Sequence, residues 1–323
     1  MKIEIKDLKS NLDLPIALFI CMASFEARCS SILEELLSVC GRFMIFKNDQ
    51  AGKLADENYA RMIAMTGEKG EGIALDLDEP LVTARSLLKI IDHVKAAGEG
   101  AVFVDVTTFT HEQLLILFRI FSMAAVGRRV VFGYTGADRY STNTDMADAW
   151  LTKGVSQVRS VLGFPGNLRP SRRLHLLMLV GFEHERAKSV IDAFEPSVLT
   201  LGLGELSQSV SSAHYESNKF FFEDVRRFVD KSASLGSAVR QFNFSCVDPE
   251  QTKAAILAQV GNLSEYNTVI CPMNTKLSTL GAALAAAERP EIQLCYARAI
   301  EYNEAGYSTP SNQVTIFTMA FDA

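Results

Sequence analysis

The chain has few of the residues and motifs that mark specialised classes of protein. Its 323 residues include one tryptophan and six cysteines, and no two cysteines are spaced Cys-x-x-Cys. No apolar run reaches the roughly 18 residues that a membrane-spanning helix needs. The opening residues alternate charged and apolar side chains, unlike a signal peptide. We therefore expect a cytoplasmic protein, and neither a membrane protein nor a disulfide scaffold.

Catalytic and cofactor motifs are also missing. His-Glu-x-x-His, Gly-x-Ser-x-Gly and the P-loop pattern do not occur, and the Gly-x-Gly that starts at Gly202 lacks the third glycine of a dinucleotide site. We therefore expect no metal and no cofactor, and nucleophilic hydrolysis has little support. Three cysteines, Cys21, Cys271 and Cys295, lie in apolar, strand-like runs. This placement predicts buried free thiols.

The charge balance is mildly acidic. The formal net charge is −6, and the charged fraction of 22% and hydrophobic fraction of 48% are ordinary for a globular protein with sizeable cores. A negative net charge argues against broad binding to DNA or RNA. It leaves room for a small anionic ligand in a local pocket.

The most informative feature that is present is an internal repeat. Landmarks recur in the same order in the two halves: Ile16–Arg28 and Leu174–Arg186, Ala101–Thr108 and Thr268–Thr275, and the tyrosine pairs Tyr134/Tyr140 and Tyr296/Tyr302. Both tyrosines are offset by the same 162 residues (296 − 134 and 302 − 140). A repeat of this length predicts two similar units, related by duplication and a pseudo-twofold axis.

Apolar runs of strand length alternate with helical spacing through both halves. Ile16–Met22 is a continuous apolar run, whereas Val82–Ala97 has apolar residues on one helical face. Such alternation predicts an α/β fold made of two tandem Rossmann-like parallel-sheet units. The proline- and glycine-rich segment 163–173 marks the join, so we expect domains at 1–165 and 172–323. Val314–Met319 is expected to form an edge or hairpin strand.

Ligands of open parallel sheets bind beyond the carboxyl ends of the strands. In the first half, Asp105 ends a predicted strand, and Thr107 and Thr108 follow it before a helix. Hydroxyls and free amides at a helix start bind anions. The alternative is purely structural, with Thr110 and Gln113 forming a capping box.

The matching loop of the second half carries Asn274, Thr275 and Lys276 at the start of a predicted helix. The helix dipole disfavours a lysine at this position. The residue becomes favourable if its ammonium group faces a phosphate. The alternative interpretation is a solvated surface lysine.

The loops after the first strand of each half share an acid and an arginine, Glu26 with Arg28 and Glu183 with Arg186. The helix dipole favours the acids. The arginines either clamp an anion or pair with the neighbouring acids.

Tyrosines follow the last predicted parallel strand of each half. Tyr134 and Tyr140 belong to the first half, and Tyr296 and Tyr302 to the second. Their rings are candidates for stacking on a nucleobase or sugar. The alternative is packing between the halves.

Together these loops favour a module that binds a small anionic, nucleotide-like ligand. Through Asp105-Val-Thr-Thr108, Asn274-Thr-Lys276 and the architecture of both halves, the chain resembles the CARF-like sensor domains of prokaryotic defence systems. Those domains act as Rossmann-like dimers that bind cyclic oligonucleotides. The sequence has no recognisable nuclease or helix-turn-helix domain, so the resemblance implies a separately encoded protein partner.

Two other functions stay open. The chain is an enzyme acting on a nucleotide or sugar phosphate if Asp105, Glu26 and Glu183 supply acid–base chemistry beside Lys276. It is a structural or interaction protein if the duplicated sites have decayed, since decay would also produce the differences between the two halves.

Overall fold

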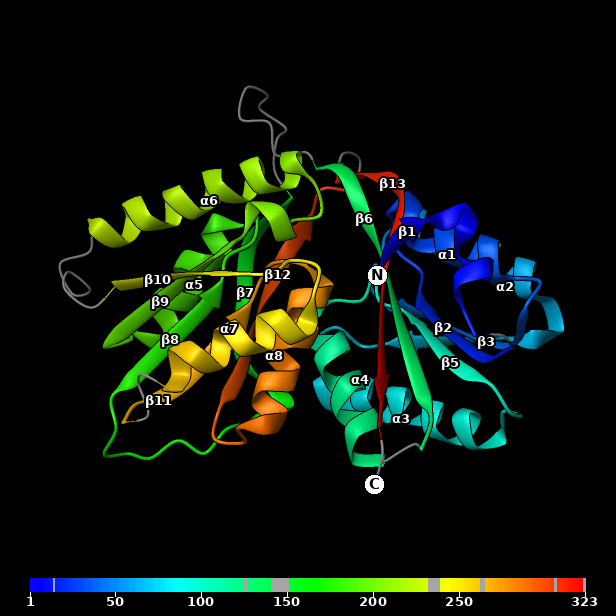
Figure 1. Cartoon of the computed structure of the whole chain (residues 1–323), viewed down its shortest axis with the longest axis horizontal. Helices are drawn as coiled ribbons and strands as arrows, with labels where there is room; N and C mark the ends of the chain where they lie inside the picture. Colours follow the sequence, from blue (N-terminus) through cyan, green and yellow to red (C-terminus); the bar gives the residue numbers. More distant parts are fainter. Residues whose placement is uncertain are drawn as a thin grey trace. The chain divides into compact units, whose positions relative to one another are not determined.

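The computed structural model (Figure 1) describes residues 1–13, 15–124, 127–140, 151–231, 239–261, 265–304 and 307–321. It is a mixed α/β protein with two sheets of mostly parallel strands flanked by helices. The chain falls into two compact units. Unit 1 comprises Met1–Asp138 and Ser308–Ala323, and unit 2 comprises Arg139–Tyr307.

Unit 1 is built on a sheet whose described strands have the order β1-β13-β6-β5-β2-β3-β4. The strands are β1 (Lys2–Glu4), β2 (Ile16–Met22), β3 (Cys40–Asn48), β4 (Gly70–Leu75), β5 (Ala101–Asp105), β6 (Arg129–Tyr140) and β13 (Ser308–Ala320). The run from β4 to β6 is parallel, and β1 pairs antiparallel with β13. Every residue of β2 is buried, as its continuous apolar run predicts for an inner parallel strand.

Helices cover both faces of this sheet. They are η1 (Ile5–Asp7), η2 (Lys9–Asn11), η3 (Ala27–Ser30), α1 (Ser31–Leu36), α2 (Lys53–Thr66), η4 (Gly67–Lys69), α3 (Pro80–Ala96) and α4 (His111–Ala124). Helix α3 begins with a proline, which suits the first helical turn, and buries Leu87, Ile90 and Val94 on one face. Helices α1 and α2 pack on the sheet face that carries Phe19.

Unit 2 is built on a sheet whose described strands have the order β10-β9-β8-β11-β12-β7. They are β7 (Thr152–Pro165), β8 (Leu174–Leu179), β9 (Val198–Gly204), β10 (Val239–Phe244), β11 (Asn267–Pro272) and β12 (Gln293–Tyr302). All neighbours are parallel except β7, which pairs antiparallel with β12.

The helices of unit 2 are α5 (His184–Phe194), η5 (Leu206–Gln208), α6 (Ser212–Asp230), α7 (Pro249–Gly261) and α8 (Lys276–Glu288). Helices α5 and α6 pack on one face of the sheet, and α7 and α8 lie on the other (Figure 1). A Cβ atom on Gly281 would lie 2.5 Å from Thr252, so glycine lets α7 approach α8 closely. None of the described helices has the length and apolar character to cross a membrane.

The two sheets share one strand order. Across the sheets, the spatial order β4-β3-β2-β5-β6 of unit 1 corresponds to β10-β9-β8-β11-β12 of unit 2. The order reverses between β2 and β5 in the first sheet, and between β8 and β11 in the second. Duplication of one Rossmann-like unit would produce this shared order.

The last strand of each half belongs to the other unit. Strand β7 follows β6 in the chain but pairs with β12, whereas β13 follows β12 but lies between β1 and β6. The compact units therefore differ from the expected domains 1–165 and 172–323, because long-range strand pairing decides which unit a strand joins. For the same reason, the expectation that Val314–Met319 forms an edge strand was wrong. This segment belongs to β13, and β1 is the edge strand beside it.

All six cysteines are buried and free, which confirms the prediction made for Cys21, Cys271 and Cys295. Burial raises the pKa of the Cys29 thiol to about 11 and those of Cys40 and Cys246 to about 12. These thiols stay protonated at neutral pH and behave as small apolar side chains.

Candidate functional site

Each sheet has a switch point at its carboxyl edge, and the predicted residues divide between the two units. Unit 1 holds Glu26, Arg28, Asp105, Thr107, Thr108 and Tyr134, and unit 2 holds Glu183, Arg186, Asn274, Thr275, Lys276 and Tyr296. All except the tyrosines lie in, or directly beside, the loops that follow β2, β5, β8 and β11. These are the loops that bind ligands in open α/β sheets.

Arg28 is buried in a network inside unit 1. Its Nε donates to Glu26 Oε2 at 2.8 Å, and its Nη1 donates to the carbonyl of Thr135 at 2.9 Å. Its guanidinium carbon lies 5.9 Å from the centroid of the Tyr134 ring. Glu26 in turn accepts a hydrogen bond from the Ser308 hydroxyl at 2.5 Å. Carboxylate, carbonyl and aromatic ring together compensate the buried charge.

Arg186 is held in the same way in unit 2. It donates to Glu183 and to the carbonyl of Ala297, and its guanidinium carbon lies 5.5 Å from the centroid of the Tyr296 ring. Glu183 Oε1 accepts a hydrogen bond from the Thr152 hydroxyl at 2.6 Å. Burial opposes the positive charge, but the Glu183 carboxylate and nearby phenols more than offset it and raise the pKa of Arg186 above its ordinary value.

The two arginine networks therefore match contact for contact. In each, the acid comes from the same loop as the arginine, and the carbonyl comes from the residue after the buried tyrosine. The hydroxyl on the acid comes from Ser308 or Thr152, the first residue of the exchanged strand. Of the two roles left open for the arginines, the structure shows the ion pair with the acids.

The sequence analysis predicted that Tyr134 and Tyr296 follow the last parallel strands, and this prediction was wrong. They lie within β6 and β12 and are 3% and 4% exposed. Both strands continue beyond their apolar starts because each gains an exchanged strand as its second neighbour. The two rings therefore pack beneath the guanidinium groups.

Asp105 is the most perturbed carboxyl of the candidate set. It is 2% exposed, and its Oδ1 accepts a hydrogen bond from the Thr107 amide at 3.0 Å. Oδ2 has no hydrogen-bond partner among the described residues. Burial raises the pKa of Asp105 to about 7, although hydrogen bonds from Thr107 and the Arg28 charge oppose this shift. The carboxyl therefore titrates near neutral pH.

The start of α4 is a capping box, as predicted. The Gln113 amide donates to Thr110 Oγ1 at 3.1 Å, and the Thr110 amide donates to Gln113 Oε1 at 3.0 Å. The two preceding threonines bond to neighbouring strands. Thr107 Oγ1 accepts from the Thr135 amide, and the half-buried Thr108 donates to the carbonyl of Met22 at 2.5 Å.

Thr275 caps α8 and ties it to the sheet. Its hydroxyl accepts from the Ser278 amide at 3.1 Å and donates to the carbonyl of Cys246 at 2.6 Å. Lys276 is the first residue of α8 and is half-buried. The structural counterpart of Thr275 is therefore the capping residue Thr110. The sequence repeat had instead aligned Thr275 with Thr108, two residues earlier.

Asn274 bridges the switch point of unit 2. Its Nδ2 donates to the carbonyl of Val180 at 2.7 Å, and its Oδ1 accepts from the Thr275 amide at 2.9 Å. The bond from Thr108 to Met22 spans the equivalent gap in unit 1. In unit 1, a side chain that follows β5 bonds to the end of β2. In unit 2, a side chain that follows β11 bonds to the residue after β8.

Two asparagines that the sequence analysis did not single out brace the same loops. Asn58 in α2 donates to the carbonyl of Ser24 at 2.8 Å, and Asn218 in α6 donates to that of Val180 at 2.8 Å. Asn218 is fully buried. A polar residue among the inward-facing positions of an amphipathic helix was the signal that could have identified it.

An aromatic cluster lies beside the switch point of unit 2. The Phe182 ring centroid is 4.9 Å from that of Tyr140, 4.8 Å from that of His214 and 6.2 Å from that of Phe221. Tyr307 adds a ring 6.2 Å from Tyr140. Phe182, Tyr140 and Tyr307 are half-buried, so the cluster reaches the surface. The accessible parts of these rings can stack on a planar ligand.

The two switch-point loops of unit 2 are in direct backbone contact. A Cβ atom on Gly181 would lie 1.8 Å from the carbonyl oxygen of Met273, so only glycine fits there. This contact brings Phe182, which follows Gly181, to the same edge as Lys276 at the start of α8. An aromatic surface, a cation and the amides of a helix start then lie at one switch point.

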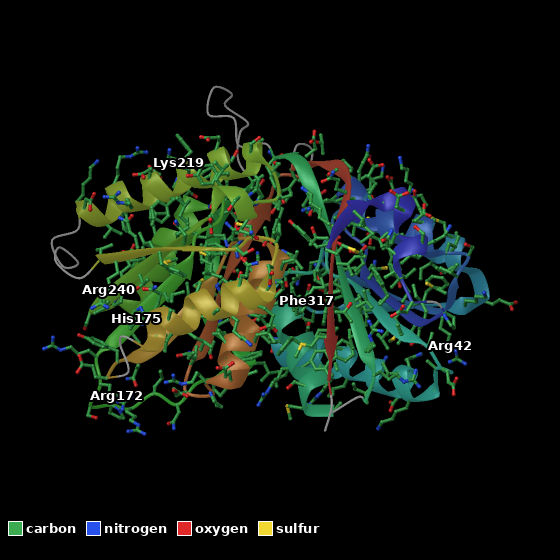
Figure 2. All side chains as sticks on the ribbon, viewed as in Figure 1. Arg42, Arg172, His175, Lys219, Arg240 and Phe317 are labelled. Atoms are coloured by element: carbon green, nitrogen blue, oxygen red, sulfur yellow. The ribbon has the colours of Figure 1, made fainter. Side chains whose placement is uncertain are left out.

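His175, labelled in Figure 2, is a buried core residue that is hydrogen-bonded within the sheet. It is fully buried, and its two ring nitrogens lie 3.2 Å from Thr268 Oγ1 and 2.8 Å from Thr200 Oγ1. Burial, together with the nearby charge of Arg240, lowers its pKa to about 4. Within the described residues, no group of histidine, cysteine and acidic side chains is arranged to hold a metal.

No protein-family model matches the chain, and no curated protein matches it by sequence. Among solved structures, it is similar to a type III CRISPR defence DNA nuclease activated by cyclic oligoadenylate, with 8% identity over 83% of this chain and a TM-score of 0.49. The match spans 63% of the nuclease.

Other solved structures also match. The pyocyanin biosynthetic protein PhzM matches at 14% identity over 45% of this chain and 39% of its own, with a TM-score of 0.25. The cytoplasmic domain of a prokaryotic cation chloride cotransporter matches at 8% identity over 90% of this chain and 99% of its own, with a TM-score of 0.26. None of the three TM-scores exceeds 0.49, so the function proposed below rests on the residues of this chain.

Proposed function

We propose that the chain binds a nucleotide or another phosphorylated small molecule at the carboxyl edge of the unit 2 sheet. The observation that carries the proposal is the contact between Gly181 and Met273, which brings Phe182 to the same edge as the start of α8. The rings of Phe182 and Tyr140 stack on the base. Lys276 and the first amides of α8 hold the phosphate.

Charge and size support a small ligand. Stacking on an aromatic side chain contributes about 1–3 kcal/mol per base, and an anion at a helix start about 0.3–1 kcal/mol. The net charge of −6 disfavours a long polyanion. Lys276 at the first position of α8 is unfavourable for the helix alone, and a bound phosphate would compensate for it.

The resemblance to CARF-like sensors gives this proposal a narrower form. In that form the ligand is a cyclic oligonucleotide, and its binding acts as a signal to a separately encoded partner. Cyclic oligoadenylates therefore belong among the ligands tested.

The test is calorimetric titration of the whole chain with ATP, AMP, ribose 5-phosphate and cyclic oligoadenylates. We expect at least one ligand to bind wild type, and we expect Lys276→Gln and Phe182→Leu each to weaken it about fivefold or more. Lys219→Gln is the matched control, because Lys219 is an exposed lysine of α6 in the same unit (Figure 2). Equal affinities in all variants, or no binding by wild type, would contradict the proposal.

One observation favours an enzyme as the second candidate. The pKa of Asp105 is raised to about 7, a value suited to acid–base catalysis near neutral pH. An enzyme of this kind should lose turnover in Asp105→Asn while still binding its ligand. Turnover that survives this substitution would remove Asp105 from the mechanism.

A further inference from the structure

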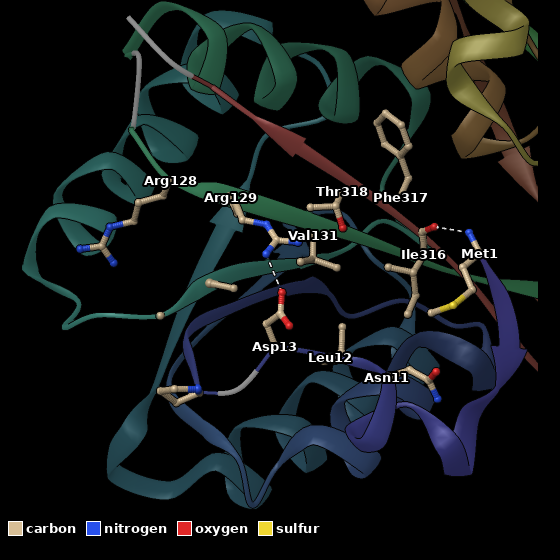
Figure 3. Close-up of a pocket in the computed structure, with 13 residues that line it drawn as sticks. Met1, Asn11, Leu12, Asp13, Arg128, Arg129, Val131, Ile316, Phe317 and Thr318 are labelled. Atoms are coloured by element: carbon tan, nitrogen blue, oxygen red, sulfur yellow. Dashed lines mark hydrogen bonds and ion pairs between the residues drawn. The ribbon is translucent and has the colours of Figure 1, made fainter.

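A cavity of about 580 Å³ lies in unit 1 at the edge of the sheet opposite to the switch-point loops (Figure 3). It opens where β5 and β6 begin and where β13 passes them. Pockets for small molecules typically measure about 300–1,000 Å³. Its lining includes Leu12, Asp13, Arg128, Arg129, Val131 and Ile316.

Charged and apolar side chains occupy different ends of the cavity. Figure 3 shows Arg129 and Asp13 toward one end and Met1 and Ile316 toward the other, with the guanidinium group of Arg128 pointing outward beyond Arg129. Leu12 and Val131 add apolar surface between these ends. The lining is therefore amphipathic.

The charged end is positive. The guanidinium group of Arg128 donates to the carbonyls of Gly98 at 2.8 Å and Ala97 at 2.9 Å. These two bonds fix its position, and no carboxylate of the described residues forms an ion pair with it. Arg129 donates to Asp13 at 2.5 Å, but the two side chains are 63% and 78% exposed.

An anion can compete for the exposed pair at low cost. Exposed ion pairs add little to stability, so Arg129 can turn from Asp13 toward a ligand with little loss. With two arginines and one aspartate, the cavity has excess positive charge in a chain whose net charge is −6. Local charge opposite to that of the whole chain favours a specific anion.

The backbone holds the rim in place without a ligand. Gly100 has φ of +134°, and a Cβ atom there would lie 2.5 Å from the carbonyl oxygen of Pro15, so the position requires glycine. Met1 and Ile316 exchange two backbone hydrogen bonds of 2.8 and 2.7 Å. The cavity is therefore preformed, which lowers the entropic cost of binding.

We propose that this cavity binds a small amphipathic anion. Its carboxylate or phosphate bonds to Arg129, and its apolar body packs on Leu12, Val131 and Ile316. The site is separate from the nucleotide site proposed for unit 2, so either proposal can fail without the other.

The test uses the fluorescent probe 8-anilinonaphthalene-1-sulfonate, an aromatic anion, with the whole chain. We expect one saturable site from which octanoate and octyl phosphate displace the probe and neutral octanol does not. The more effective of the two anions identifies the headgroup. Arg129→Gln should weaken probe binding about fivefold or more. Arg42→Gln, at an exposed arginine of β3 outside the cavity, should leave it unchanged (Figure 2).

A second variant separates the site from other apolar surfaces. Thr318 is exposed on β13 at the cavity wall, so Thr318→Trp should fill the space and abolish probe binding with little change in melting temperature. Phe182→Leu in unit 2 should bind the probe as wild type does. Unchanged affinity in Arg129→Gln and Thr318→Trp, or displacement by octanol as strong as by octanoate, would overturn the proposal.

Discussion

Buried arginines explain much of what the two halves share. Arg28 and Arg186 are 4% and 5% exposed, and a buried cation must be paired. Glu26 and Glu183 supply the pairing charge in the two units. The repeated glutamate and arginine are therefore accounted for by a structural ion pair, without a ligand at these two positions.

This account predicts a strong asymmetry between single and double substitutions. Arg186→Met leaves Glu183 buried without its partner and should lower the free energy of unfolding by about 3–5 kcal/mol. The double variant Glu183→Met/Arg186→Met removes both charges and should be less destabilised. Urea denaturation of the whole chain measures the free energy of unfolding of both variants. A double variant at least as unstable as the single one would show that the pair is not charge-compensated as described.

Asp105 predicts a pH dependence of stability. Its pKa is raised from 3.8 to about 7 by folding, so the folded chain binds this proton more tightly than the unfolded chain. Its contribution to the free energy of unfolding should therefore fall as pH rises from about 4 to about 7, by at most about 4 kcal/mol. Asp105→Asn should lack this slope.

The measurement is denaturation of wild type and Asp105→Asn at several values of pH. The difference between the two proteins isolates Asp105, because His175 contributes equally to both. Parallel profiles would contradict the raised pKa.

At the residue scale, the sequence predicted local interactions better than burial. The capping box of Thr110 and Gln113 could be read directly, because its partners are three residues apart. The burial of Tyr134 and Tyr296 could not, because it depends on exchanged strands that arrive from far along the chain.

At the scale of the element, the starts of the helices are important because they lie at the carboxyl edge of each sheet, where ligands would bind. Thr275 both caps α8 and bonds to the loop after β10. Thr275→Ala should lower the free energy of unfolding by about 1–2 kcal/mol, whereas Thr275→Ser keeps the hydroxyl and should cost less. Chemical denaturation of the two variants checks this. Equal losses would mean that the methyl group, rather than the cap, is important.

Elements with regular patterns were predictable, and those shaped by distant partners were not. The predicted strand Ile16–Met22 is β2 itself, and the predicted helix Val82–Ala97 is α3 shifted by one or two residues. Strand β7 was missed because register shifts against β12 interrupt its alternation of side chains. Strand β13 was recognised in part, but its place between β1 and β6 depends on pairing that no local pattern reveals.

At the scale of the whole molecule, each half of the chain completes the sheet of the other unit. Strand β13 lies inside the unit 1 sheet and contributes the buried residues Val314 and Ile316. Strand β7 covers the free side of β12 in unit 2. Exchanged strands of this kind make the two halves of the chain dependent on each other.

This dependence predicts the behaviour of a divided chain. If segments 1–140 and 151–323 are expressed together as separate polypeptides, they should copurify, because β13 of the second must pair with β6 of the first. Expressed alone, 1–140 should aggregate, since β6 would present an unpaired edge. Size-exclusion chromatography of the coexpressed and single segments measures this. Two independent, folded monomers would contradict the exchange.

The central claim is that a nucleotide-like ligand binds where Phe182 and the start of α8 lie on one edge. Photocrosslinking with 8-azidoadenosine triphosphate, followed by peptide mapping, tests it most directly. We predict saturable labelling of residues 180–184 or 273–276 that unlabelled ATP prevents. Labelling confined to other segments, or labelling that ATP does not reduce, would contradict the account.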